Sequence, residues 1–130
     1  DILIMAAAVA DYRPKEKAIN KIKKEEKDIL TIELVKNPDI LKEIAKIKKS
    51  DQIVIGFCAE SENLIANASK KIQEKNLDFI VANDISDKEI GFNSDFNEIT
   101  LIDKSLNKNL FKREKKKELA KKLLKIIFQN

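Results

Sequence analysis

Three short runs of apolar residues constrain the fold of this chain most strongly. Residues 2–8, 53–55 and 79–82 contain apolar side chains only, without the alternation that marks a strand with one wet face. Such runs are typical of strands covered on both faces, as in a parallel sheet. Helical patterns lie between consecutive runs, so the order of the elements predicts right-handed βαβ crossovers and an α/β fold.

The helical patterns begin with capping signals. Asn37 is a preferred N-cap residue, Pro38 suits the first helical position and Asp39 favours the positive end of the helix dipole, which predicts a helix over 38–49. Ser61 predicts the start of a second helix, which ends at Asn76. The apolar stripes comprise Ile40, Leu41, Ile44, Ala45 and Ile47 in the first helix, and Leu64, Ile65, Ala68 and Ile72 in the second.

The remaining segments complete one domain over residues 1–130. Residues 11–28 carry many lysines and few apolar side chains, which predicts a basic, flexible loop over 12–28. Residues 29–35 alternate as a half-buried strand, and 83–95 form a turn-rich loop. A hairpin over 98–103 and 109–112 and a closing helix follow. The expected architecture is a Rossmann-like three-layer αβα arrangement with a mainly parallel sheet.

Composition excludes several classes of protein. No apolar stretch approaches the roughly 20 residues of a membrane span, and no signal peptide is present, so we expect a cytoplasmic protein with no membrane partner. One cysteine and no histidine leave neither a disulfide nor the ligands of a zinc site, so any metal would bind oxygen ligands. The net charge of +4 comes from interspersed lysine and glutamate, so nucleic-acid binding is not required.

The first residues predict a fragment of a longer protein. The sequence begins at Asp1 and enters the apolar run at once, which is an unfavourable free terminus. We therefore expect partner strands upstream of this chain.

Four segments are expected to meet at the carboxyl edge of the sheet, where ligands of such folds bind. They are residues 7–11, the turn at 37–41, residues 56–60, and Asn83 with Asp84. The helix start at Pro38 suits a phosphate, although Asp39 partly opposes an anion and most helix N-termini bind nothing. Asp11 suits a base, a sugar or Mg²⁺, or simply closes a turn.

Several lysines near this edge either bind a phosphate or are ordinary solvated surface residues. The sequence KIKK over 21–24 places ammonium groups where a triphosphate could recruit them, yet taken alone it is more often a solvated loop. Lys71 and Lys75 lie one helical turn apart, so they are able to reach one anion, or they only form part of the solvated face of the helix. Cys58 has no histidine to activate it, so a small buried residue is the favoured interpretation.

The ordered motifs resemble one family. The sequence contains AAAVADYRP at 6–14, KIKK at 21–24, KNPDIL at 36–41, GFCAE at 56–60, ANDIS at 82–86 and GFNSDFN at 91–97. Together they resemble bacterial phosphopantothenoylcysteine synthetase over essentially the whole chain. Cys58 departs from the family's usual small residue after GF, and the family's upstream half, with its glycine-rich segment, is not in this sequence.

The resemblance implies a reaction and its partners. The family joins L-cysteine to 4′-phosphopantothenate with CTP and Mg²⁺ through an acyl-cytidylate, in coenzyme A biosynthesis. It is often fused behind a flavin-dependent decarboxylase, so FMN is expected only on such a fused domain. The resemblance also implies a homodimer, and this chain would be the CTP side of the enzyme.

The resemblance assigns roles to residues of this chain. Lys21 is the expected catalytic residue, contacting the developing phosphate charge or the acyl-cytidylate from a loop able to close over it. No metal ligands are assigned. The expected CTP contacts are Met5, Ala6, Ala7, Asp11, Lys21, Pro38, Asp39, Ile40, Leu41, Phe57, Lys71 and Lys75. The alternative is a non-catalytic nucleotide- or nucleic-acid-binding module, whose lysines only screen phosphates.

Overall fold

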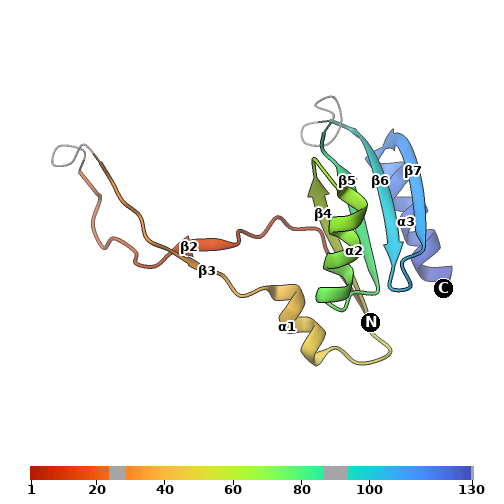
Figure 1. Cartoon of the computed structure of the whole chain (residues 1–130), viewed down its shortest axis with the longest axis horizontal. Helices are drawn as coiled ribbons and strands as arrows, with labels where there is room; N and C mark the ends of the chain where they lie inside the picture. Colours follow the sequence, from red (N-terminus) through yellow and green to blue (C-terminus); the bar gives the residue numbers. More distant parts are fainter. Residues whose placement is uncertain (24–28, 87–93, 130) are drawn as a thin grey trace. The chain divides into compact units, whose positions relative to one another are not determined.

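A five-stranded sheet organises most of the chain (Figure 1). In the computed structural model, β1 (Ile2–Met5), β4 (Ile53–Glu60) and β5 (Phe79–Asp84) run parallel, and β6 (Phe96–Asp103) and β7 (Lys108–Lys115) extend the sheet antiparallel. The strand order is β1-β4-β5-β6-β7. The structure describes residues 1–23, 29–86 and 94–129. The parallel core confirms the predicted α/β class.

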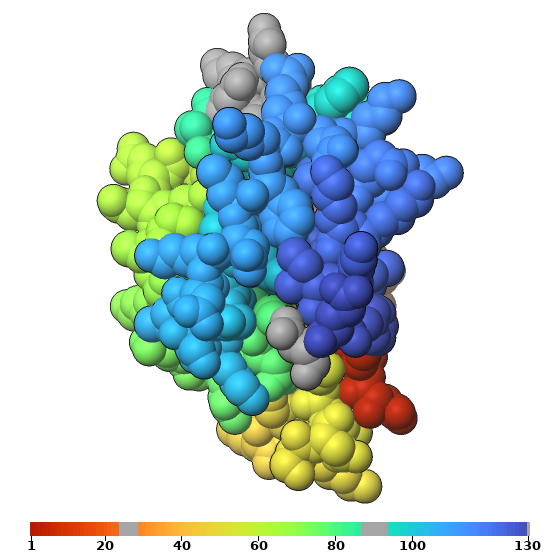
Figure 2. All heavy atoms as spheres, turned by 90° about the vertical axis from the view of Figure 1, so that its right-hand side faces the viewer, coloured from red at the N-terminus to blue at the C-terminus, as the bar shows by residue number. Residues whose placement is uncertain are grey.

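Helices cover both faces of this sheet. The helices α1 (Ile40–Ile47) and α2 (Leu64–Glu74) contribute to one apolar core, and α3 (Lys116–Gln129) contributes to a second core on the opposite face. Successive residues of β4 serve the two cores in turn, with Val54 and Cys58 on the α2 side and Ile55 on the α3 side. Figure 2 shows the sheet from the edge formed by β7, with α2 and α3 on opposite sides of it. The predicted three-layer arrangement is confirmed.

The chain divides into two compact units. Unit 1 comprises residues 1–6 and 41–130, and unit 2 comprises residues 7–40, where β2 (Tyr12–Pro14) pairs antiparallel with β3 (Leu34–Lys36). Every described side chain that is fully buried belongs to unit 1. Unit 2 is therefore held by its strand ladder and polar contacts rather than by a core of its own.

The first strand is shorter and less covered than its sequence predicts. β1 ends at Met5 rather than at Ala8, and Ile2 and Ile4 are 36% and 45% exposed. Leu3 and Met5 pack against the α1 and α2 core, so one face of β1 is covered and the other is not. The expectation of cover on both faces was wrong for this strand.

Unit 2 differs from the sequence interpretation in two ways. The strand predicted over 29–35 is limited to Leu34–Lys36, and Tyr12–Pro14, predicted as part of a loop, is its partner strand. Arg13 stabilises the pair, because its Nη1 donates to the Lys36 carbonyl at 2.9 Å and to Asn37 Oδ1 at 3.0 Å. Part of the predicted basic loop, residues 24–28, lies outside the described residues.

The helix starts also differ from the predicted ones. α1 begins at Ile40 rather than at Pro38, because the Asn37 side chain is engaged elsewhere, its Nδ2 donating to the Ala10 carbonyl at 2.7 Å. The N-cap of α2 is Asn63, with a left-handed φ of 51° and no side-chain capping bond, rather than Ser61. The cause is that β4 runs on to Glu60, so residues 61–63 must make the turn. Asn76, with φ of 46°, follows the end of α2 as predicted.

The terminal hairpin and helix are confirmed and are longer than predicted. Asp103 closes the turn between β6 and β7, accepting bonds at 2.9 Å from the backbone of Ser105 and Asn107 and from the Asn107 amide. Along α3, the buried residues Leu119, Leu123 and Ile127 recur every fourth position. Among the described residues, no helix has the length and apolarity needed to cross a membrane.

Gly56 marks the closest packing between β4 and the helical layer. A Cβ added there would lie 2.7 Å from Leu77 Cδ1 and 3.3 Å from Leu41 Cδ1. Leu77 is itself buried, so it has little room to move aside. The glycine therefore lets the chain after α2 approach the sheet, next to the strand end that carries the candidate site.

Candidate functional site

The carboxyl ends of the parallel strands lie at the edge where the sequence predicts a ligand site, and β4 and β5 extend beyond the end of β1. Met5, at the end of β1, pairs with Gly56, and Glu60 and Asp84, which end β4 and β5, pair with each other. β4 and β5 extend further than predicted, so Phe57, Cys58 and Glu60 belong to β4 itself rather than to a loop behind it. Backbone pairing thus fixes the positions of these side chains.

Glu60 connects this edge to α2. Its Oε1 accepts a bond from Lys71 Nζ at 2.5 Å, and its Oε2 accepts one from Asn67 Nδ2 at 3.2 Å. The Lys71 bond is the main reason why the pKa of Glu60 is lowered, and the Asn67 bond acts in the same direction. Glu60 and Asn67 were not predicted as site residues. Their signal in the sequence was a carboxylate at a strand end followed by amide and ammonium groups one helical turn apart.

Cys58 is influenced by Lys71 and by Lys75. The thiol is buried, and desolvation raises its pKa, while the positive charges of Lys71 and Lys75 act in the opposite direction. Both lysines thus act electrostatically on the same thiol, and an anion shared between them stays a prediction. The raised pKa fits the favoured interpretation of Cys58 as a small buried residue and not as a reactive thiol.

Phe57 faces away from this cluster. Neighbouring strand residues point to opposite faces of the sheet, and Cys58 packs in the core with α2. Phe57 consequently lies on the α3 face, where it is 41% exposed. The Phe57 ring therefore points away from the face that carries Glu60 and Lys71. A ligand on that face would contact the Phe57 backbone, and the ring would contact only a ligand group on the α3 face.

The end of β5 adds two polar groups. Asp84 Oδ1 accepts a bond from the backbone of Ser86 at 2.8 Å, and bonds from Ser86 lower the pKa of Asp84. The Asn83 Oδ1 atom is buried, and no group in residues 1–23, 29–86 and 94–129 donates a hydrogen bond to it. Residues 87–93 of the predicted loop lie outside the described part of the chain.

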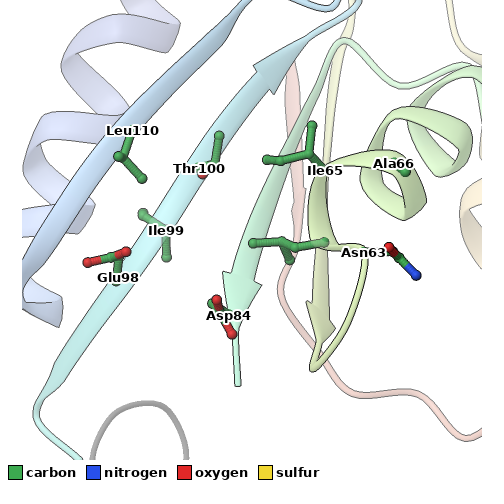
Figure 3. Close-up of a pocket in the computed structure, with 9 residues that line it drawn as sticks. Asn63, Ile65, Ala66, Asp84, Glu98, Ile99, Thr100 and Leu110 are labelled. Atoms are coloured by element: carbon green, nitrogen blue, oxygen red, sulfur yellow. The ribbon is translucent and has the colours of Figure 1, made fainter. Parts of the chain in front are cut away.

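A cavity of about 490 Å³ opens beside Asp84, on the flank of α2 that faces β6 and β7. Figure 3 shows Asp84 and Glu98 near one end of it and Thr100, Leu110 and Ile65 further along. None of the expected CTP contacts lines this cavity, whereas Asp84, which the sequence also places at the ligand edge, does.

Unit 2 contains a second group of predicted residues. The Asn37 backbone donates to the Asp11 carbonyl at 2.8 Å, which brings Asp11 next to the turn that holds Pro38, Asp39 and Ile40. Lys21 is exposed. Ala7 also belongs to this unit, whereas Met5, Ala6, Leu41, Phe57, Lys71 and Lys75 belong to unit 1. A site that uses both groups stays a prediction.

The described residues do not form a metal site of their own. No group of three or more carboxylate or cysteine side chains with metal-binding spacing occurs in the described part of the chain. Glu60 and Asp84 are each engaged by neighbours. The described residues therefore do not form an all-protein Mg²⁺ site, and Mg²⁺ stays a prediction, since this ion is usually held by one or two carboxylates together with substrate phosphates.

Comparison with known proteins places these observations in a family. The chain is 49% identical over 129 residues to "Coenzyme A biosynthesis bifunctional protein CoaBC" of Borreliella burgdorferi, covering 98% of this chain and 32% of that protein. It is 44% identical over 108 residues to the protein of the same name from Bacillus subtilis, covering 83% and 26%. A "Cysteine/Cysteine sulfinic acid decarboxylase" from an unknown prokaryotic organism is 42% identical over 127 residues, covering 98% and 35%.

Solved structures give the same fold. The crystal structure of the C-terminal domain of a CoaBC protein matches 98% of this chain and 53% of its own, with a TM-score of 0.74 and 37% identity. A DNA/pantothenate metabolism flavoprotein from Streptococcus pneumoniae matches with a TM-score of 0.75 at 22% identity, which supports the fold alone. The chain spans about a third of the length of the first curated relatives it matches. Because the sequence model of the family covers residues 1–130, this chain belongs to the family of the DNA/pantothenate metabolism flavoprotein C-terminal domain.

Proposed function

We propose that this chain is the nucleotide-side portion of a CTP-dependent ligase that joins 4′-phosphopantothenate to L-cysteine in coenzyme A biosynthesis. The observation that carries the proposal is the relationship over nearly the whole chain to proteins named for coenzyme A biosynthesis, at 49% identity over 129 residues. Lys71, which pairs with Glu60 at the end of β4, and Lys75 supply charge of the sign that a triphosphate needs.

The proposed reaction has two steps. The carboxylate of 4′-phosphopantothenate attacks the α-phosphate of CTP and expels pyrophosphate, which gives an acyl-cytidylate. The amine of cysteine then attacks the acyl carbon and displaces CMP. Both steps move negative charge onto phosphate oxygens, so fixed cations and correct positioning supply most of the catalysis.

In this proposal the lysines neutralise the phosphates. Lys71 and Lys75 bind the triphosphate from α2, and Lys21 contacts the phosphate charge that develops at the reacting centre. An ammonium group about 4 Å from a phosphate oxygen contributes roughly 4 kcal/mol at a dielectric typical of a protein surface. No step is assigned to Mg²⁺. The homodimer, and FMN on a fused decarboxylase domain, remain predictions of the same resemblance.

Substitution of Lys21 tests the proposal. In the longer protein that carries this chain, we expect Lys21→Gln to lower kcat for CTP-dependent pyrophosphate release about 100-fold, because one fixed charge at the developing phosphate is lost. Lys17→Gln is the matched control, since Lys17 is another exposed lysine of unit 2. Equal rates for the wild type and Lys21→Gln would refute the role of Lys21.

Nucleotide selectivity separates the ligase from a non-catalytic phosphate-binding module. A site formed by strand-end backbone groups is expected to prefer CTP over ATP, and pyrophosphate release is expected to require 4′-phosphopantothenate. A charged surface would bind any polyanion with an affinity that falls steeply with salt. Equal affinity for CTP and ATP without pyrophosphate release would favour the binding module.

A further inference from the structure

We propose that Glu60 is a positioning residue, which holds the Lys71 ammonium group in place for a nucleotide phosphate at the carboxyl edge of the sheet. The proposal rests on the proposed function, in which Lys71 contacts the nucleotide. It adds a residue that makes no contact with the nucleotide itself and acts through Lys71.

Two rigid elements hold the partners of this ion pair. Glu60 ends β4 opposite Asp84, and its carbonyl oxygen accepts a bond from the Ile85 backbone at 3.1 Å. Lys71 lies on α2 between Ala68 and Ile72, which are 0% and 1% exposed. The strand ladder fixes one partner and the packed helix face fixes the other, so their separation is a property of the fold.

The carboxylate of Glu60 uses both oxygens on the same flank of α2. Oε1 binds Lys71 and Oε2 binds Asn67, which precedes Lys71 by one helical turn. Asn67 Nδ2 also donates to the Glu62 carbonyl at 3.2 Å. This two-point attachment orients the carboxylate, and an oriented carboxylate in turn selects one position for the Lys71 ammonium.

The environment favours a charged, ordered pair. The Glu60 and Lys71 side chains are 21% and 41% exposed, which places the pair at the rim of the sheet edge rather than in bulk solvent. The lowered pKa of Glu60, caused chiefly by the Lys71 bond, keeps the carboxylate ionised at neutral pH. An ammonium group carries three N–H donors, so a carboxylate that takes one of them orients the group without exhausting it.

Two roles for Glu60 give opposite expectations. If Glu60 only neutralises Lys71, a phosphate must displace it, and its removal will tighten CTP binding. If Glu60 positions Lys71, its removal frees a long, flexible side chain, and CTP binding will weaken. The sign of the change in KM for CTP therefore decides between them.

The experiment is a double-mutant cycle on pyrophosphate release by the longer protein that carries this chain. We expect Lys71→Gln and Glu60→Ala each to raise KM for CTP about tenfold, with a smaller change in kcat. The double variant is expected to show no more than the effect of Lys71→Gln alone. Glu60→Gln keeps the size of the side chain and an acceptor for Lys71, so we expect it to raise KM roughly threefold.

Glu114→Gln is the matched control. Glu114 and Lys122 form an ion pair with the same 2.5 Å distance, between β7 and α3, away from the α2 flank. We expect this variant to leave KM for CTP unchanged. Thermal unfolding of every variant identifies any loss of the fold, and Glu60→Gln provides the readout if Glu60→Ala does not fold.

Several results would overturn the proposal. A raised KM in Lys71→Gln together with an unchanged or lowered KM in Glu60→Ala and Glu60→Gln would show that Glu60 does not position Lys71. Additive effects in the double variant would show that the two residues act separately. An unchanged KM in Lys71→Gln would remove the contact on which the proposal depends, even where Lys21→Gln supports the ligase. Absence of CTP-dependent pyrophosphate release by the wild type would instead overturn the proposed function, and this proposal with it.

Discussion

Asp78 joins three parts of unit 1 at the edge opposite to the candidate site. Its Oδ2 accepts bonds from Lys48 Nζ at 2.7 Å and from the Val54 backbone at 2.8 Å, and Lys104 Nζ lies 3.9 Å from Oδ1. Only 15% of the Asp78 side chain is exposed. One carboxylate thus connects the end of the first helical segment, β4 and the hairpin turn.

Removal of this carboxylate is expected to be costly. Asp78→Ala leaves the partly buried Lys48 ammonium and the Val54 N–H without their acceptor, so we expect the free energy of unfolding to fall by about 2–4 kcal/mol. Urea denaturation measures the change. Glu43→Gln is the control, because the Glu43–Lys46 pair is exposed and is expected to contribute under about 0.5 kcal/mol. Similar losses for both variants would contradict this prediction.

At the residue scale, the sequence predicted types of residue better than it predicted their partners. Lys71 and Lys75 were predicted to act on one anion, which stays a prediction. Glu60 and Asn67 were missed, because a contact between a strand end and a helix flank depends on tertiary structure. Asn37 was predicted as an N-cap, but its side chain binds the Ala10 carbonyl, a partner 27 residues earlier in the chain.

At the scale of elements, periodicity predicted which segments form elements and whether each is a helix or a strand, and long-range pairing determined how long each strand is. β4 was predicted to end near Gly56 but continues to Glu60, because β5 pairs with it over that whole stretch. β3 was predicted to begin at Ile29, but the described pairing with β2 covers only Leu34–Lys36. A single sequence contains no information about where a partner strand stops. The pattern of α3 needed no distant partner and was predicted well.

The stripe along α3 gives a test at this scale. Leu123 is 8% exposed and packs in the core, whereas Leu124 is 39% exposed on the same helix. We expect Leu123→Ala to lower the free energy of unfolding by about 2–4 kcal/mol and Leu124→Ala to lower it by less than about 1 kcal/mol. Because both changes have the same effect on helix propensity, the difference measures packing. Equal losses in thermal or urea unfolding would contradict the assigned helix face.

At the scale of the whole molecule, apolar burial is unequally divided. Unit 1 contains both cores, and in residues 7–23 and 29–40 of unit 2 no side chain is fully buried. The predicted site residues nevertheless fall in both units. The alternation over residues 29–35 did not indicate this division, because the apolar residues of unit 2, such as Leu34 and Val35, resemble core residues in a periodicity pattern.

Hydrogen exchange tests the division. We expect backbone amides of β4 and β5 to exchange only through global unfolding, and those of β2 and β3 to exchange at least about 100-fold faster through local opening. The reason is that no core must be disrupted to separate β2 from β3. Mass spectrometry of peptides from each strand measures the rates. Equal protection in the two pairs of strands would show that unit 2 is stabilised in another way.

The position of Tyr12 has a practical consequence. The chain contains one tyrosine and no tryptophan, and Tyr12 lies in β2, half exposed, within unit 2. Its fluorescence therefore reports on unit 2 alone, whereas the far-ultraviolet circular dichroism of α2 and α3 reports on unit 1. This chain thus carries two separate optical signals, and ligand binding or unfolding can be assigned to either unit without attaching a dye.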